Sequence, residues 1–353
     1  MVAAIRRSLL RFYDRRARDL PWRRSRDPYA IWVSEIMLQQ TRVDTVLSYY
    51  DRFLERFPTA EALAAADEDR VMAAWSGLGY YRRARLLHRG VRDVVEHYGG
   101  QVPRDPEARR ALPGIGRYTA GAIGSIAFGL PEPLVDGNVA RVLSRLLSID
   151  TPQGRADTER RLWAEAQRMV QGERPGDFNQ ALMELGATVC TKHAPRCDDC
   201  PLTKRCAARA QGRVEELPVA RRRTEPRVVA MVGLLALSPR PQRVWLQRRP
   251  VGGLFAGLWN LPLSELGGGE GRDVALGLLT DAGLAGRLSP EPIAELSHVL
   301  SHRRLEVQLW RATTARPRGG RRPEASCYSA AALPDLGLSA LTRRALSTSG
   351  FGS

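Results

Sequence analysis

Residues 105–120, which read DPEARRALPGIGRYTA, decide the fold of the first half of the chain. Asp105 is a good helix cap and Pro106 suits the first helical position, so a helix should begin there. A proline rarely continues a helix, so this one should end before Pro113. A second helix is expected from Arg117. The stretch therefore predicts two helices joined by a short turn.

The turn between these helices is rich in glycine, at Gly114 and Gly116. Glycine permits backbone conformations that other residues avoid, and its missing side chain allows a close approach. The backbone N–H groups at the start of the second helix can then reach a phosphate oxygen. Residues 112–120 are therefore interpreted as a helix–hairpin–helix, with both glycines as DNA contacts. A plain Pro-Gly turn is the alternative.

An aspartate follows the turn by twenty residues, at position 136 within VDGNVARV (135–142). Asp136 precedes an expected helix, and the simplest interpretation is an N-cap. Helix N-terminal donors also stabilise an ionised carboxylate and should keep its pKa low, as is needed opposite a cationic transition state. One residue can fill both roles.

A second carboxyl group lies in IWVSEIML (31–38), a strongly apolar stretch. At helical spacing Ile31, Glu35 and Leu38 share one face. A desolvated carboxyl group has a raised pKa and keeps its proton, so Glu35 is expected to act as an acid. The alternative is a helix that turns Glu35 toward solvent.

Four of the five cysteines lie close together with the spacing C-x6-C-x2-C-x5-C, whereas Cys327 stands alone. Zinc sites with four thiolates usually pair two short knuckles, whereas a single C-x2-C flanked by distant cysteines suits a cubane cluster better. We expect a [4Fe-4S] cluster, with zinc as the alternative. The expected ligands are Cys190, Cys197, Cys200 and Cys206.

Composition narrows the class of protein further. The 353 residues are 43% hydrophobic and carry 54 Lys+Arg against 38 Asp+Glu, a formal net charge of +16. That charge favours a polyanionic partner such as nucleic acid, although charge alone is weak evidence. Residues 1–23 scatter arginines among apolar residues and resemble neither a signal peptide nor a membrane span. We expect a cytoplasmic, DNA-associated monomer with no membrane contact.

The pattern of the chain changes near residue 227. Before that point we predict helices, at 59–75, 82–97, 108–112 and 158–170 among others. After it we predict strands, at 228–237, 244–248 and 305–310. The expected architecture is multi-domain, with an all-α helix–hairpin–helix domain over 1–210 that carries the iron–sulfur loop (190–206). A linker over 211–226 and an α+β domain over 227–347 complete it.

Several segments together resemble the signature blocks of MutY adenine glycosylases, members of the helix–hairpin–helix glycosylase superfamily. The blocks are LPWR (20–23), SEIMLQQTRV (34–43), GLGYY (77–81), LPGIGRYTA (112–120), VDGNVARV (135–142) and FNQALMELG (178–186). The resemblance implies base excision repair of adenine mispaired with 8-oxoguanine or guanine in duplex DNA. The cysteine spacing likewise resembles the [4Fe-4S] loop of these enzymes and of endonuclease III.

The resemblance also implies roles for individual residues. Glu35 would protonate N7 of a flipped-out adenine, and Asp136 would stabilise the oxocarbenium-like sugar by charge or by a transient covalent bond. Trp22 and Arg23 would lie near the adenine pocket around Glu35, and Gln40 and Tyr80 would enter the duplex where the base was extruded. Thr41 and Leu78 would be further DNA contacts. Without the resemblance, Trp22 and Tyr80 would be interpreted as core aromatics.

One position separates this chain from glycosylases that also act as lyases. Where endonuclease III-like enzymes carry an attacking lysine, this chain has Tyr118, which resembles the MutY tyrosine beside the catalytic aspartate. The resemblance also makes Asn138 an orienting residue, with local helix capping as the alternative. We therefore predict a monofunctional glycosylase. The rivals are an endonuclease III-like or thymine-mismatch enzyme for pyrimidines and a non-catalytic iron–sulfur DNA-binding protein.

The segment after residue 227 resembles a Nudix, or MutT-like, domain, through GLWNLP (257–262) and DAGL (281–284). Residues 276–281 stand where its metal-binding carboxylates belong and supply only Asp281, so pyrophosphatase activity is not expected. HVLSH (298–302) resembles the MutY loop that distinguishes 8-oxoguanine from guanine, with Leu300 in place of its phenylalanine. Ser301 and His302 keep the hydrogen-bonding groups.

Overall fold

A computed structural model describes the chain except for residues 221–224, 240–242, 251, 301, 318–324 and 352–353. It divides into two compact units, of which the first holds Met1–Ala65 and Arg82–Arg223 and the second Ala66–Tyr81 and Thr224–Ser353. Among the described residues, no helix is long and apolar enough to cross a membrane. The predicted classes are confirmed, with helices in the N-terminal region and a strand-rich C-terminal domain.

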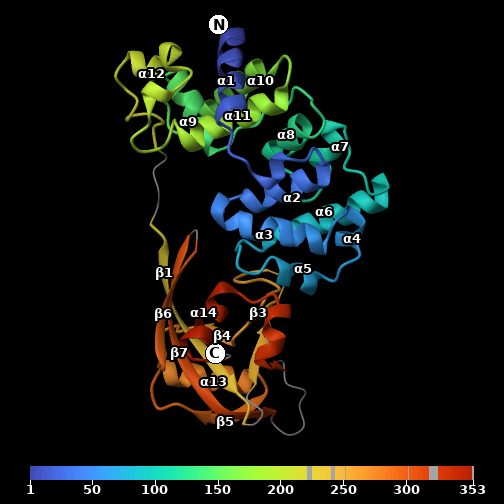
Figure 1. Ribbon diagram of the computed structural model, residues 1–353. Coiled ribbons are helices and arrows are strands. Elements are labelled where there is room, and N and C mark those ends of the chain that lie inside the picture. Colours follow the sequence, from blue (N-terminus) through green and yellow to red (C-terminus); the bar gives the residue numbers. More distant parts are fainter. Residues whose placement is uncertain (221–224, 240–242, 251, 301, 318–324, 352–353) are drawn as a thin grey trace. The chain divides into compact units, whose positions relative to one another are not determined.

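Helices form the first unit (Figure 1). The α-helices are α1 (Val2–Arg16), α2 (Pro28–Leu38), α3 (Val43–Arg56), α4 (Ala60–Ala64), α6 (Arg82–Tyr98), α7 (Pro106–Ala111), α8 (Arg117–Ile126), α9 (Gly137–Leu146), α10 (Ala156–Val170), α11 (Pro175–Thr188) and α12 (Ala207–Ala210). The 3-10 helices are η1 (Pro21–Arg23), η2 (Cys197–Asp199) and η3 (Thr203–Arg205).

The two helices of the hairpin are present where the sequence predicts them. The Asp105 side chain accepts a hydrogen bond from the Ala108 N–H at 2.8 Å and so caps α7. Gly114 has φ +81°, and a Cβ there would lie 2.8 Å from the Cβ of Leu86. Only glycine easily allows both this positive φ and the close approach of Leu86, which explains why residue 114 is a glycine.

One predicted helix is wrong. The apolar pattern over residues 59–75 suggested a single helix, but the structure has α4 and, separately, α5 (Glu68–Ala74). Thr59 caps α4 through the Ala62 N–H, and Asp67 is the N-cap residue of α5 in an extended conformation. Apolar residues keep a helical spacing across this break because each short helix buries its own apolar face. The spacing alone therefore does not show where α4 ends and α5 begins.

The described residues of the second unit form an eight-stranded mixed sheet. The strands are β1 (Arg227–Leu237), β2 (Val244–Arg248), β3 (Trp259–Asn260), β4 (Leu263–Glu265), β5 (Leu284–Leu288), β6 (Ala294–Val299), β7 (Arg303–Pro317) and β8 (Ser326–Tyr328). β1 and β7 run parallel over ten residue pairs, from Arg227 beside Arg303 to Ala236 beside Ala312, and the other pairs are antiparallel. The helices are α5, η4 (Ala330–Asp335), α13 (Gly271–Asp281) and α14 (Ala340–Thr348).

Successive residues of β1 point to opposite faces of the sheet, and each face is apolar. Val232 and Leu234 belong to the core on the α13 side, whereas Met231 and Leu235 belong to the core on the α14 side. Because both faces are covered, the strand is almost continuously hydrophobic rather than alternating.

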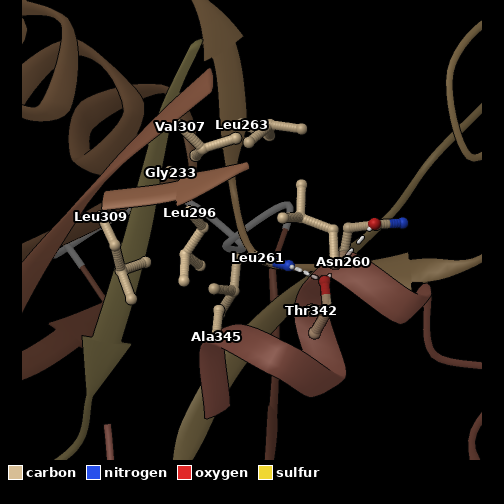
Figure 2. Close-up of a pocket in the computed structure, with 10 residues that line it drawn as sticks. Gly233, Asn260, Leu261, Leu263, Leu296, Val307, Leu309, Thr342 and Ala345 are labelled. Atoms are coloured by element: carbon tan, nitrogen blue, oxygen red, sulfur yellow. Dashed lines mark hydrogen bonds between the residues drawn. The ribbon is translucent and has the colours of Figure 1, made fainter. Parts of the chain in front are cut away.

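Helix α14 is fixed to the sheet by packing and by hydrogen bonds (Figure 2). Side chains from β3, β4, β6, β7 and α14 line a narrow apolar cavity, where Gly233 of β1 leaves room for its neighbours. At its edge the Thr342 hydroxyl accepts the Leu261 N–H at 3.1 Å and lies 3.4 Å from Asn260 Oδ1. The first turn of α14 is therefore held against β3.

Candidate active site

Glu35 lies in α2, a helix buried along nearly its whole length. Asp27 caps the helix by accepting the N–H groups of Tyr29 and Ala30, and Pro28 takes the first position. Residues 29–37 are all buried, and Glu35 is only 5% exposed. The prediction of a desolvated carboxyl group is confirmed, and the solvent-facing alternative is wrong.

The environment of Glu35 raises its pKa to about 7. Loss of water is the largest cause, because burial disfavours the charged carboxylate. The Tyr118 hydroxyl donates a hydrogen bond to Oε2 at 2.7 Å, which lowers the pKa and thus opposes the effect of burial. The charge of Asp136 raises it further, and that of Arg23 lowers it. Near neutral pH this acid therefore holds a proton that it can release.

Tyr118 lies in the first turn of α8, directly after the glycine turn. Its hydroxyl also lies 3.5 Å from the Met183 sulfur of α11. Burial and the charges of Glu35 and Asp136 raise the pKa of Tyr118 well above its ordinary value, so the phenol stays protonated and donates. Tyr118, which the sequence predicts beside Asp136, therefore donates a hydrogen bond to Glu35. The charges of both acids act on its hydroxyl.

Asp136 is the N-cap of α9, as the sequence predicts. Its Oδ1 accepts the Val139 N–H at 2.7 Å, and its Oδ2 accepts the Asn138 side-chain amide at 2.9 Å. The expected low pKa is wrong in direction. Burial raises the pKa of Asp136, and the hydrogen bonds from Val139 and Asn138, which lower it, offset this only in part. The sequence showed the cap but not how deeply the carboxylate is covered.

Arg141, which sequence reasoning missed, extends this network. Its Nη2 donates to the Asn138 amide oxygen and to the Gly186 carbonyl, both at 2.8 Å, and its Nε donates to the Cys190 carbonyl at 2.8 Å. Gly186 is required here, because a Cβ would lie 2.7 Å from that of Asn138. Hydrogen bonds therefore run from the Asp136 carboxylate to the backbone of Cys190, the first of the four clustered cysteines.

Glu184 is a second missed residue, although it lies inside one of the quoted sequence blocks. Its buried carboxylate pairs with Arg18 Nε at 2.8 Å and with Arg23 Nη2 at 2.8 Å. Burial raises the pKa of Glu184, but the hydrogen bonds from both arginines outweigh that effect and leave it lowered. The ion pair fixes Arg23, whose charge also acts on Glu35. Trp22 beside it is buried and contacts the Tyr50 ring edge-on, with the centroids 5.5 Å apart.

The turn after α2 carries Gln40 and Thr41. Arg83 donates to the carbonyl oxygens of Ile36 and Met37, at 2.7 and 2.8 Å, and thereby caps the end of α2. It also donates to the Thr41 hydroxyl at 3.0 Å, which ties that residue to the framework. Gln40 itself is exposed with φ +58°, a left-handed conformation that turns it away from the helix.

The remaining predicted contacts lie in different parts of the chain. Gly116 caps α8 with open space around its Cα, and no side chain caps that helix. In the second unit, Leu78 is buried, whereas Tyr80 is 49% exposed with φ +49°. His302 is exposed in the turn between β6 and β7, and Ser301 lies outside the described residues.

The four clustered cysteines line one cavity in the first unit. Cys190 follows α11, Cys197 begins η2, Cys200 follows η2, and Cys206 precedes α12. No described group of three or more His, Cys, Asp or Glu side chains is arranged to hold a single metal ion. The four thiols nevertheless line one common cavity, so these donors surround a shared space without converging on a single point. A polynuclear cluster fits such a donor set better than a single zinc ion does.

Arg145 is the buried cation of this cysteine site. Its Nη1 lies 3.4 Å from the Cys190 sulfur, and the Cys206 thiol lies 3.4 Å from its carbonyl oxygen. The guanidinium also donates to two carbonyl oxygens of the loop, at Thr191 (2.7 Å) and Lys192 (3.3 Å), and to the Leu217 carbonyl beyond the loop at 2.8 Å. A single side chain therefore holds the loop and supplies positive charge beside the sulfurs.

Comparison with known proteins agrees with this geometry. Residues 33–168 match the model of the HhH-GPD superfamily base excision DNA repair proteins, and residues 233–348 match the NUDIX domain. A thermostable thymine-DNA glycosylase of known structure superposes with a TM-score of 0.54 at 31% identity, over 60% of this chain and 97% of that one. The helical region is thus that of a base-excision DNA glycosylase, with the acid of α2 and the capping aspartate of α9 inside the matched part.

Proteins with similar sequences show which kind of DNA glycosylase this chain resembles. The adenine DNA glycosylase of Rattus norvegicus is 40% identical over 365 residues, covering 88% of this chain and 70% of the relative. That of Homo sapiens is 51% identical over 225 residues, covering 61% of this chain and 41% of the relative. The chain belongs to the adenine DNA glycosylase family.

The Tyr118 hydrogen bond gives a testable prediction for pH dependence. Because this bond lowers the pKa of Glu35, Tyr118→Phe should raise that pKa above about 7. If the protonated acid is the active form, the alkaline limb of the pH–rate profile should move to higher pH. Single-turnover base excision measured from neutral to mildly alkaline pH tests this. Tyr29→Phe, which removes a hydroxyl bonded to the Phe57 carbonyl at 2.9 Å, is the matched control. An alkaline limb that stays in place or moves to lower pH would contradict the assignment.

Proposed function

We propose that the chain is a monofunctional DNA glycosylase that hydrolyses the N-glycosidic bond of adenine mispaired with 8-oxoguanine or guanine in duplex DNA. The observation that carries the proposal is the buried Glu35, bonded to Tyr118 and close enough to Asp136 for their charges to interact. Burial raises the pKa of both acids, but hydrogen bonds from Val139 and Asn138 partly offset this effect at Asp136, which favours Glu35 as the acid and Asp136 as the carboxylate. Membership of the adenine DNA glycosylase family supports adenine as the base.

The first step is proton transfer from Glu35. The adenine is flipped out of the stack, and the Glu35 carboxyl group gives its proton to N7. The C1′–N9 bond then breaks with its electrons moving to the base, which leaves as neutral adenine. The ion pair with Glu184 would hold Arg23 against the edge of the base, beside Trp22. Arg23 would not donate a proton in this step.

The second step takes place at the sugar. As the bond breaks, positive charge develops at C1′ and O4′, and the Asp136 carboxylate stabilises it. The Val139 N–H and the Asn138 amide hold both carboxylate oxygens in place. Water then gives a hydroxyl group to C1′, and its proton returns to the Glu35 carboxylate. Tyr118 offers no amine to attack the sugar, which favours hydrolysis without strand cleavage.

The hairpin between α7 and α8 would bind the DNA backbone. Gly114 and Gly116 leave the N-terminal amides of α8 accessible, and a helix N-terminus attracts phosphate. Gln40 and Thr41, after α2, would contact the duplex near the extruded base, and Leu78 and Tyr80 are the proposed contacts from the loop after α5. The net charge of +16 agrees with a polyanionic partner.

A [4Fe-4S] cluster is the proposed cofactor, held by Cys190, Cys197, Cys200 and Cys206. The cluster would fix the loop around it and present that loop to the DNA backbone. Burial raises the pKa of the Cys200 thiol to about 11, and the positive charge of bound iron would favour its thiolate form. The Arg145 guanidinium beside Cys190 would stabilise the same charge.

The main experiment compares the wild-type protein with Glu35→Gln. Purified protein is incubated with duplexes that contain A opposite 8-oxoguanine, A opposite G, A opposite T or T opposite G, and hot alkali then cleaves the abasic sites. Wild-type protein should act on the first two duplexes. Glu35→Gln should bind the mispair equally but excise roughly 100-fold more slowly or worse, because a general acid contributes about 10²–10⁴-fold.

Glu96→Gln is the matched control, since Glu96 is an exposed residue of α6. It should excise adenine at the wild-type rate. Equal rates for Glu35→Gln and wild type would refute the acid role. Cleavage of T opposite G alone would instead support a pyrimidine glycosylase, and no cleavage of any duplex would support a DNA-binding protein without catalysis.

The cluster is tested by spectroscopy and metal analysis. Wild-type protein should absorb visible light and contain about four iron atoms and four sulfides per chain, as a cubane requires. Cys197→Ser should lose most of this absorption. Cys327→Ser should keep it, because Cys327 lies in β8 of the second unit and does not line the four-cysteine cavity. Colourless protein that contains one zinc ion would favour the zinc alternative.

Reading of the opposite base is proposed for the turn between β6 and β7. The double variant Ser301→Ala, His302→Ala should slow adenine excision opposite 8-oxoguanine more than opposite guanine, by roughly tenfold for one or two lost hydrogen bonds. Single-turnover rates on the two duplexes measure the ratio, and His97→Ala in α6 is the control. Equal losses on both duplexes would remove this role.

A further inference from the structure

The segment Ala66–Tyr81 belongs to the second unit, although the chain on both sides of it belongs to the first. Its helix α5 packs against η4, and Asp69 pairs with Arg248 of β2 at 2.8 Å. Gly337 lies so close to the helix that a Cβ there would be 2.6 Å from the Cβ of Met72. The loop that follows α5 is therefore built on the sheet domain.

The Tyr81 hydroxyl joins this loop to the sheet domain. The tyrosine is 9% exposed, and its hydroxyl donates to the Leu338 carbonyl at 2.8 Å. The same oxygen accepts the Gly77 N–H at 3.3 Å and lies 3.2 Å from the Ser76 hydroxyl. One phenol thus bonds both the start of the loop and the C-terminal domain.

The acceptor of this bond is itself rigidly held. Leu338 forms a bridge with Trp259 of β3, whose N–H donates to the Gly337 carbonyl at 3.0 Å. The next residue, Ser339, caps α14 by accepting the Thr342 N–H at 3.1 Å. Leu338 therefore lies between a sheet strand and a helix start, and its carbonyl oxygen offers a fixed point.

Arg343 of α14 provides a second attachment. Its Nε donates to the Ser76 hydroxyl at 2.9 Å, and its Nη2 contacts the same oxygen. Two side chains therefore attach the loop to the C-terminal domain. Tyr81 reaches from the end of the loop to the domain, and Arg343 reaches from the domain to the loop.

The loop between these attachments has an unusual backbone. Gly77 and Gly79 have φ +106° and +72°, and Tyr80 has φ +49°. A left-handed conformation is unfavourable for a residue that carries a Cβ. Such a conformation persists only where surrounding contacts determine it. Here the Trp75 indole donates to the Gly79 carbonyl at 3.2 Å, and the Tyr81 and Arg343 bonds fix the loop on both sides of the glycines.

We propose that Tyr81 and Arg343 are positioning residues for base extrusion, which hold the loop 76–80 so that the Tyr80 side chain is presented to the DNA duplex. This inference rests on the proposed function, in which Tyr80 contacts the duplex from the loop after α5. It adds a second role for the C-terminal domain, which would help to extrude the adenine that is paired with 8-oxoguanine or guanine. Neither residue touches the reacting atoms.

The test measures base extrusion separately from bond breaking. Duplexes carry 2-aminopurine at the target position opposite 8-oxoguanine, and its fluorescence rises when it is unstacked. Tyr81→Phe and Arg343→Met should lower this signal, and should slow excision of paired adenine about fivefold, the effect of roughly one hydrogen bond. Adenine in a single-base bulge needs less unpairing, so its excision should approach the wild-type rate. The pH–rate profile should not move.

The control variants are Tyr29→Phe, which loses a buried hydroxyl in the first unit, and Arg272→Met at an exposed position of α13. Rates are normalised to the active fraction from the burst amplitude, so partial unfolding does not imitate the effect. A merely structural role would slow excision from paired and bulged substrates alike, and this outcome would overturn the inference.

Tyr80→Ala separates the two levels of the proposal. If Tyr80→Ala leaves extrusion unchanged, the proposed role of Tyr80 fails, and this inference fails with it. If Tyr80→Ala lowers extrusion while Tyr81→Phe and Arg343→Met behave like the controls, only the positioning inference is wrong. The Arg343 variant keeps the test open should Tyr81→Phe fold poorly.

Discussion

The exclusion of water from Glu35 is the constraint on which the rest of the site depends. A carboxylic acid keeps its proton near neutral pH only if its charged form is poorly solvated. Helix α2 achieves this by burying all of its sides, and the opposing hydrogen bond from Tyr118 sets the pKa back to about 7. The pKa of Glu35 therefore depends on burial, which raises it, and on the Tyr118 hydrogen bond, which lowers it. Both effects require α2 and α8 to pack closely.

Much of this architecture follows from local sequence rules. Asp105, Pro106 and Gly114 define the hairpin through capping, fixed φ and positive φ, and the structure contains each of these features. Asp136 could likewise be predicted as a cap. Spacing identified the four cysteines as one group. These predictions succeeded because each depends on residues a few positions apart.

What could not be predicted depends on residues that are distant in sequence. The pKa of Asp136 rises because burial outweighs its cap, and burial comes from segments that no local pattern specifies. Glu184 and Arg141 act through partners 161 and 45 positions away, so neither showed its role in advance. The break between α4 and α5 was hidden because both helices have the same periodicity.

The path of the chain has a consequence for how the molecule can be divided. The polypeptide leaves the first unit after Ala65, returns at Arg82 and leaves again after Arg223, so the two units are interleaved. A truncation near residue 223 would keep α5 and its loop but discard Gly337 and Leu338, against which they are built. The helical half is thus not a self-contained module, because a stretch of its own sequence takes its shape from residues more than 250 positions further along the chain.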